Sequence, residues 1–102
     1  QLNPLLVERG KRYGSFNTHA QLAQQLKVIF NNHISQYGYP EQFTDVMNES
    51  LEMIFHKLAR IANGDPLYLD SWRDIAAYTE LAIENITKLD NATDAKVTIF
   101  KV

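Results

Sequence analysis

Apolar residues recur with the period of an amphipathic helix in four separate stretches of this chain. Residues 4–10 predict a short first helix, because a proline suits the first helical position and a glycine suits the end. Residues 11–16 then predict a loop, since glycines bracket this segment. A second helix is expected to begin at a cap formed by Asn17 or Thr18 and to fade before Gly38.

The third stretch predicts a longer helix over residues 40–62. It ends in the sequence Asn-Gly-Asp-Pro, where Gly64 is expected to adopt a left-handed conformation with positive φ and the proline blocks further helix. A fourth helix is expected to start at a cap formed by Asp70 or Ser71 and to continue to Ile86.

The C-terminal segment has a different pattern. Residues 90–94 read as a loop, and the sequence KVTIFKV over residues 96–102 alternates apolar and polar side chains as a β-strand does. A single strand cannot satisfy its own backbone hydrogen bonds. This tail is therefore expected to pair with another chain or to fray.

Together these elements predict an all-α fold, a four-helix bundle with two long central helices and a short β-like tail. The 102 residues fit one domain, with a core over about residues 4–88 and a tail over residues 89–102. A chain of this size has a small core. Its broad apolar stripes and its unpaired tail therefore predict a symmetric homo-oligomer.

Composition argues against several classes of protein. The net charge of -2 provides no global basic field for nucleic acid or an anionic membrane. The absence of cysteine excludes disulfides and thiolate metal sites, and it fits the reducing cytoplasm. No apolar run approaches the length of a membrane span.

Charged residues gather on two helices that follow one another in the chain. One face of the third helix carries Glu49, Glu52, His56 and Arg60. One face of the fourth helix carries Asp70, Asp74 and Tyr78. The connection between these helices is short, so they are expected to be antiparallel neighbours with facing polar residues.

Acids from two facing helices can bind Mg²⁺, which prefers oxygen ligands. The candidate metal ligands are Glu49, Glu52, Asp70 and Asp74. Glu52 and Asp74 are the candidate catalytic residues, because they come from different helices and can meet across the interface. Lys57 and Arg60 would neutralise phosphate groups, and one of them is expected to pair with an acid of the next helix. The alternative is that these acids are surface groups, a helix cap and salt bridges.

The remaining candidates for substrate binding are a mixed set: Arg12, Tyr13, His56 and Tyr78. Arg12 and Tyr13 precede a glycine and would hold a phosphate and stack on a base. Phe16 is instead expected to plug the core. His19 is interpreted as an isolated residue at the surface or its boundary.

The motifs ERGKRYGSF, LEMIFHKLARIANGDP and DSWRDIAAY resemble a family of small phage and prophage proteins of unassigned function. This resemblance covers residues 6–86, which is most of the chain. More distantly, the chain is similar to MazG-like all-α nucleoside triphosphate pyrophosphatases. Those enzymes carry Glu-x-x-Glu on one helix and Glu-x-x-Asp on the next.

The resemblance to the pyrophosphatases implies a magnesium-binding bundle, assembled as a dimer or tetramer, that releases pyrophosphate from nucleotides. It places Glu49 and Glu52 in the first motif and Asp70 and Asp74 in the second, although the second spacing here is Asp-x-x-x-Asp. Two functions stay open, and a purely structural oligomer is a third alternative. One is a magnesium-dependent hydrolase of nucleoside triphosphates. The other is a non-catalytic module that binds a nucleotide or a partner, for example by sequestering a signalling nucleotide in the host cytoplasm.

The number of carboxylates around a cavity separates these two functions. Three or four carboxylates favour catalysis, because they hold the metal. One or two, among a majority of basic residues, favour binding.

Overall fold

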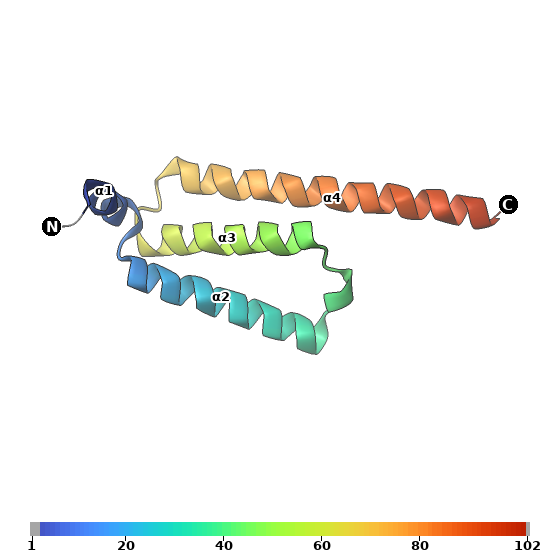
Figure 1. The fold of residues 1–102 in the computed structure, drawn as a ribbon, viewed down its shortest axis with the longest axis horizontal. Coiled ribbons are helices and arrows are strands. Elements are labelled where there is room, and N and C mark those ends of the chain that lie inside the picture. Colours follow the sequence, from blue (N-terminus) through green and yellow to red (C-terminus); the bar gives the residue numbers. More distant parts are fainter. Residues whose placement is uncertain (1–2, 102) are drawn as a thin grey trace.

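The computed structural model describes the backbone of residues 3–101 and the side chains of residues 3–91. In this part of the chain Figure 1 shows four α-helices, which are α1 (Pro4–Tyr13), α2 (Phe16–Tyr37), α3 (Asp45–Asn63) and α4 (Leu69–Lys101). Helix α3 lies in the middle and packs against α2 on one flank and α4 on the other, while α1 crosses one end (Figure 1). The predicted all-α, four-helix class is confirmed.

The junction between α1 and α2 is tighter than the sequence suggested. Helix α1 passes through Gly10 and ends at Tyr13, so the predicted loop over residues 11–16 is wrong. Two basic residues in the last turn suit this longer helix, because cations stabilise a helix C-terminus. Gly14 ends the helix with φ of 77°, and the Ser15 hydroxyl caps α2 by accepting the Asn17 N–H at 3.2 Å.

Helix α3 begins later than predicted. The proline at position 40 opens only one 3-10 turn, Pro40–Gln42. The Thr44 hydroxyl then caps α3 by accepting the Met47 N–H at 3.1 Å. A threonine cap satisfies a backbone donor that has no partner inside the helix, which favours a new start at this point.

Gly64 ends α3, but its φ is -139°, so the predicted positive φ is wrong. The position requires glycine for a different reason. A Cβ atom on Gly64 would collide with the carbonyl oxygen of Arg12 and with the backbone of Tyr13. The backbone at the end of α3 is therefore in direct contact with the backbone at the end of α1.

Helix α4 continues through Lys101, where the sequence suggested a loop and then a strand. That β-like tail is wrong over residues 90–101, and residue 102 lies outside the described residues. No glycine or proline follows residue 66, and a helix satisfies its backbone hydrogen bonds without a partner. The start of α3 is level with the middle of α4, where the Thr44 hydroxyl donates to Asn85 Oδ1 at 2.7 Å. Beyond that level α4 projects past α3 (Figure 1).

The core is small. Among the described side chains the buried apolar residues are Ala23, Phe55 and Ala59. Phe30 of α2 meets Phe55 of α3 edge to face, with 5.1 Å between ring centroids. The radius of gyration is 18.1 Å, whereas a compact domain of this length has about 13 Å. The long α4 accounts for this extended shape. Helix α3 separates α2 from α4, so the described helices form an open layer rather than a closed bundle.

Candidate functional site

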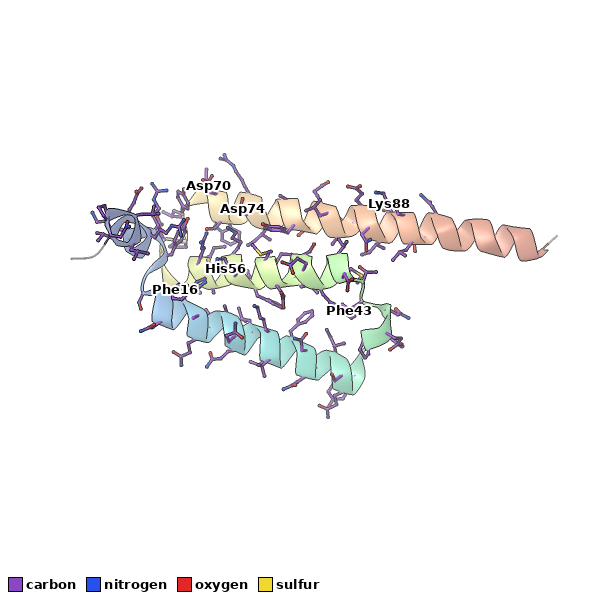
Figure 2. All side chains as sticks on the ribbon, viewed as in Figure 1. Phe16, Phe43, His56, Asp70, Asp74 and Lys88 are labelled. Carbon is purple, nitrogen blue, oxygen red and sulfur yellow. The ribbon has the colours of Figure 1, made fainter. Side chains whose placement is uncertain are left out.

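A cavity of about 550 Å³ lies between α1, the start of α2 and the second half of α3. Its lining, which we call the Arg–His pocket, consists of Leu6, Arg9, Gly10, Tyr13, Gly14, Ser15, Phe16, His19, His56 and Arg60. None of these described residues is an acid. The volume falls in the range of small-molecule sites, about 300–1,000 Å³. Figure 2 places Phe16 and His56 together at the end of the layer where α2 begins.

The side chain of Asn63 fixes one wall of the Arg–His pocket. Its Nδ2 donates to the carbonyl oxygens of Tyr13 at 2.7 Å and of Ser15 at 2.9 Å. Its Oδ1 accepts the Thr18 hydroxyl at 2.7 Å. One amide thus joins the end of α3 to the turn between α1 and α2, which keeps the pocket residues of three helices in register.

Arg60 is positioned by stacking. Its guanidinium carbon lies 4.1 Å from the centre of the Tyr13 ring, and Tyr13 meets Tyr68 edge on with 6.1 Å between centroids. Cation–π contacts of this kind hold a guanidinium over a ring while leaving its N–H groups available. Arg60 and Tyr13 therefore both line the pocket. The sequence had paired Arg60 with Lys57 for phosphate and Tyr13 with Arg12 for a base, and neither partner is part of this lining.

Arg12 takes a different position from the one expected. Its guanidinium lies over the Tyr68 ring at 4.5 Å, donates to the Tyr68 hydroxyl at 2.5 Å and pairs with Glu8 at 3.3 Å. These contacts turn Arg12 toward the connection between α3 and α4. Arg12 therefore packs on Tyr68, which contacts Tyr13, and is not part of the pocket lining.

Two histidines form a pair inside the pocket. His19 Nε2 lies 3.2 Å from His56 Nδ1, and the rings meet edge to face. His19 is only 4% exposed, and its Nδ1 has no hydrogen-bond partner among the described residues. The earlier interpretation of His19 as a surface residue is therefore wrong.

Both histidines are neutral at neutral pH. Burial lowers the pKa of His56 to about 4, and the positive charge of Arg60 adds to the effect, followed by His19, Lys57 and Lys27. Burial, followed by Arg60, also lowers the pKa of His19. A neutral imidazole can donate or accept one hydrogen bond at each nitrogen, so the pair offers both kinds of contact to a ligand.

The two candidate acids of α4, Asp70 and Asp74, are each engaged with a nearby side chain. Lys57 Nζ, in a side chain only 11% exposed, pairs with Asp74 Oδ2 at 2.9 Å. This confirms the predicted pair between a basic residue of α3 and an acid of α4. Asp70 accepts the Tyr68 hydroxyl at 3.0 Å and lies 3.9 Å from Arg73.

The acids of α3 lie elsewhere. Glu52 borders a groove between α2 and α3, beside Lys27 and Asn31, so it does not face Asp74. It is five residues from Lys57, and at about 100° per residue that spacing turns the two side chains to different sides of α3. Glu49 borders a third groove, between α3 and α4, together with Tyr78.

The four acids therefore do not form one site. Among the described residues no group of three or more histidine, aspartate or glutamate side chains is placed to hold a metal ion. The magnesium site and the catalytic roles of Glu52 and Asp74 stay predictions that this arrangement does not support.

Sequence reasoning missed three contributors to the pocket, which are Arg9, Phe16 and His19. His19 precedes the buried Ala23 by four residues, so its place on the inward stripe of α2 was a usable signal. Phe16 is 76% exposed and lines the pocket, where we expected a core residue. For Arg9 there was no signal, because the crossing angle of α1 decides which of its residues meet α3.

Comparisons with known proteins add no assignment to this geometry. No family model, curated protein or solved structure matches the chain. The resemblance to phage proteins and to MazG-like pyrophosphatases therefore stays a prediction. Within the described residues, no helix has both the length and the apolar character needed to cross a membrane.

Proposed function

We propose that this protein binds a small phosphate-bearing molecule with an aromatic ring, such as a nucleotide, in the Arg–His pocket and does not hydrolyse it. The observation that carries the proposal is the lining of the pocket. It holds Arg9 and Arg60 and contains no carboxylate among the described residues. By the criterion of carboxylate number, a basic cavity without acids favours binding over metal-dependent catalysis.

The pocket offers a different group to each part of such a ligand. Arginine donates paired hydrogen bonds in a planar fork that matches phosphate oxygens. The apolar and aromatic side chains of Leu6, Tyr13 and Phe16 suit a ring. The neutral pair of His19 and His56 suits the polar edge of a base, because imidazole nitrogens can donate or accept.

The proposal is tested by titrating ribo- and deoxynucleotides into the protein by calorimetry, with and without Mg²⁺. Arg60→Gln is the informative variant, since it removes the charge while leaving a polar side chain. Arg73→Gln is the matched control, because Arg73 is 71% exposed on α4 and is not part of the pocket lining. Hydrogen bonds to charged groups contribute about 1.5–3 kcal/mol, so Arg60→Gln is expected to weaken binding by about 10–100-fold.

The result that supports the proposal is binding of a nucleotide that Arg60→Gln weakens and Arg73→Gln leaves unchanged. Circular dichroism shows whether both variants keep their helices. Failure of every nucleotide to bind would refute the proposal. Release of pyrophosphate in the presence of Mg²⁺, lost in Asp74→Asn, would restore the hydrolase that the sequence suggested.

A further inference from the structure

Each of the three long helices has an apolar stripe that the described residues leave at least partly exposed. On α3 the stripe consists of Met47, Leu51, Ile54, Leu58 and Ile61. None of these five residues is buried, and Leu58 is 38% exposed. They are spaced alternately by four and three residues, as in a coiled coil. In coiled coils a stripe with this spacing packs against a second helix.

The α3 stripe lies on one open side of the layer. Ile54 and Leu58 each precede by one residue a buried residue of the α2 flank, Phe55 or Ala59. Leu58 also follows Lys57, which faces α4. The stripe therefore points between the two flanking helices, where the described residues cover it only in part.

The flanking helices turn their own stripes to the same side. The α2 stripe is Leu22, Leu26 and Ile29, and the α4 stripe is Trp72, Ala76, Thr79, Ile83 and Ile86. The first begins one residue before the buried Ala23 of α2, and the second one residue after the buried Ser71 of α4. Both helices run antiparallel to α3 on opposite flanks. One residue corresponds to a rotation of about 100° around a helix, so the α2 stripe and the α4 stripe are rotated in opposite senses from the sides that face α3. Because the two helices lie on opposite flanks, these opposite rotations bring both stripes to the same side of the layer.

We call this shared surface the apolar face, and its most exposed residues lie on α2 and α4. Ile29 is 68% exposed, Trp72 50% and Ile83 54%. Thr79 fits the face as well, because its hydroxyl donates back to the Ile75 carbonyl and leaves the methyl group outward. The opposite side of α3 carries His56 and Arg60, so the Arg–His pocket opens away from the apolar face.

The amount of exposed surface matches the requirement of a homodimer. The chain exposes 7884 Å², whereas a compact monomer of this size exposes about 5,900 Å². Part of the excess belongs to the projecting end of α4. Stable dimers bury about 800 Å² per partner, and obligate homodimers bury more. The excess of about 2,000 Å², even when shared with the end of α4, leaves room for the roughly 800 Å² that a stable dimer buries on each partner.

We propose that the apolar face is covered by the same face of a second copy of this chain, in a two-fold dimer that leaves both Arg–His pockets open on its outer sides. A two-fold interface places the same patch on both partners, so a neutral seam meets an identical neutral seam. The α3 stripe runs through the middle of the face and carries no charged residue. Ile54 is its central residue and lies nearest the two-fold axis.

The test combines mass in solution with two pairs of variants. Analytical ultracentrifugation of the native chain is expected to give a dimer at micromolar concentration. Leu58→Lys puts a charge into the seam and is expected to raise the dissociation constant by about 100-fold or more. Val28→Lys is the matched control, since Val28 is 56% exposed on α2 but lies outside the stripe.

Cross-linking keeps the proposal testable even if Leu58→Lys does not fold. The chain has no cysteine, so Ile54→Cys introduces a single thiol. Two such thiols near the axis approach within the distance that a disulfide requires, and mild oxidation is expected to join the copies. Val28→Cys is expected to react much more slowly. A monomeric native protein, a dimer that Leu58→Lys leaves intact, or equal cross-linking of the two cysteine variants would overturn the proposal.

Discussion

Three glycines near the Arg–His pocket have different structural roles. Gly14 has φ of 77° and sits against the backbone of Asn63, while Gly64 sits against the backbone of Arg12. Gly10 lies inside α1 with open space around it. The sequence marks all three as glycines, but only the packing of α1 on α3 tells them apart.

Alanine substitutions at these glycines should therefore change the free energy of unfolding in different directions. Gly14→Ala combines positive φ with a collision and should lower the free energy of unfolding by about 1–3 kcal/mol. Gly64→Ala should lower it by a similar amount, through the collision alone. Gly10→Ala should raise it by about 0.5–1 kcal/mol, because alanine favours the helix. Urea denaturation measures all three, and a stable Gly64→Ala would contradict the close contact between α1 and α3.

His56 makes the stability of the protein depend on pH. Its pKa falls from 6.5 to about 4 on folding, so between these values the unfolded chain binds a proton that the folded chain excludes. Stability should therefore be fully present above pH 6.5 and fall as the pH is lowered toward 4. His19 on α2, whose pKa is also lowered, acts in the same direction.

The pH effect can be assigned with two glutamine variants. The melting temperature of His56→Gln should fall less between pH 7 and pH 5 than that of the native protein. Glutamine binds no proton in the unfolded chain, so this contribution to acid unfolding is lost. His33→Gln, at an exposed position on α2, should leave the native slope unchanged. Identical slopes in all three proteins would show that the histidine pair does not control acid stability.

At the scale of the helices, the ion pair between Lys57 and Asp74 links α3 to α4. The side chain of Lys57 is nearly buried, whereas that of Asp74 is 46% exposed, which moderates the strength of the pair. Asp74→Asn leaves the lysine charge without its partner and should cost about 1–3 kcal/mol of stability.

Two further variants separate this effect from a general loss of charge. Glu84→Gln breaks the exposed pair with Lys88 and should leave the free energy of unfolding nearly unchanged, because solvent screens that pair. Adding Lys57→Met to Asp74→Asn should recover part of the lost stability, because it removes the stranded charge. If Asp74→Asn is as stable as the native protein, the ion pair orients the two side chains but does not stabilise the fold.

The helices themselves were predictable from the sequence because their apolar stripes are regular, while their ends and partners were not. The predicted strand over residues 96–102 rested on alternation alone, and a lone strand has no partner in this chain. The predicted metal site rested on one polar face of α3 and one of α4. Arg60 and His56 of the α3 face did reach the Arg–His pocket, but Glu52 and Glu49 lie in two other grooves. Which acids come together depends on how each helix is rotated about its own axis relative to its neighbour. The spacing of residues within one helix does not determine that rotation.

At the scale of the whole molecule, the proposed dimer makes thermal stability depend on concentration. Two chains separate on unfolding, so mass action raises the melting temperature as protein is added. For an unfolding enthalpy of about 0.7 kcal/mol per residue, a tenfold increase in concentration should raise it by about 3–4 °C. Calorimetry over a concentration series measures this shift, and Leu58→Lys should abolish it. A constant melting temperature for the native protein would indicate a monomer.

The central position of α3 also shapes the order in which the chain folds. Helix α3 forms an antiparallel hairpin with α2 on one flank and with α4 on the other, and each hairpin is closed by a short connection (Figure 1). Such local contacts form quickly, since closing a short loop costs little entropy. The Asn63 contact with Tyr13 spans 50 positions of the chain and needs the α2–α3 hairpin first. We therefore expect the three long helices to assemble before α1 docks, so that the Arg–His pocket is the last feature the folding chain completes.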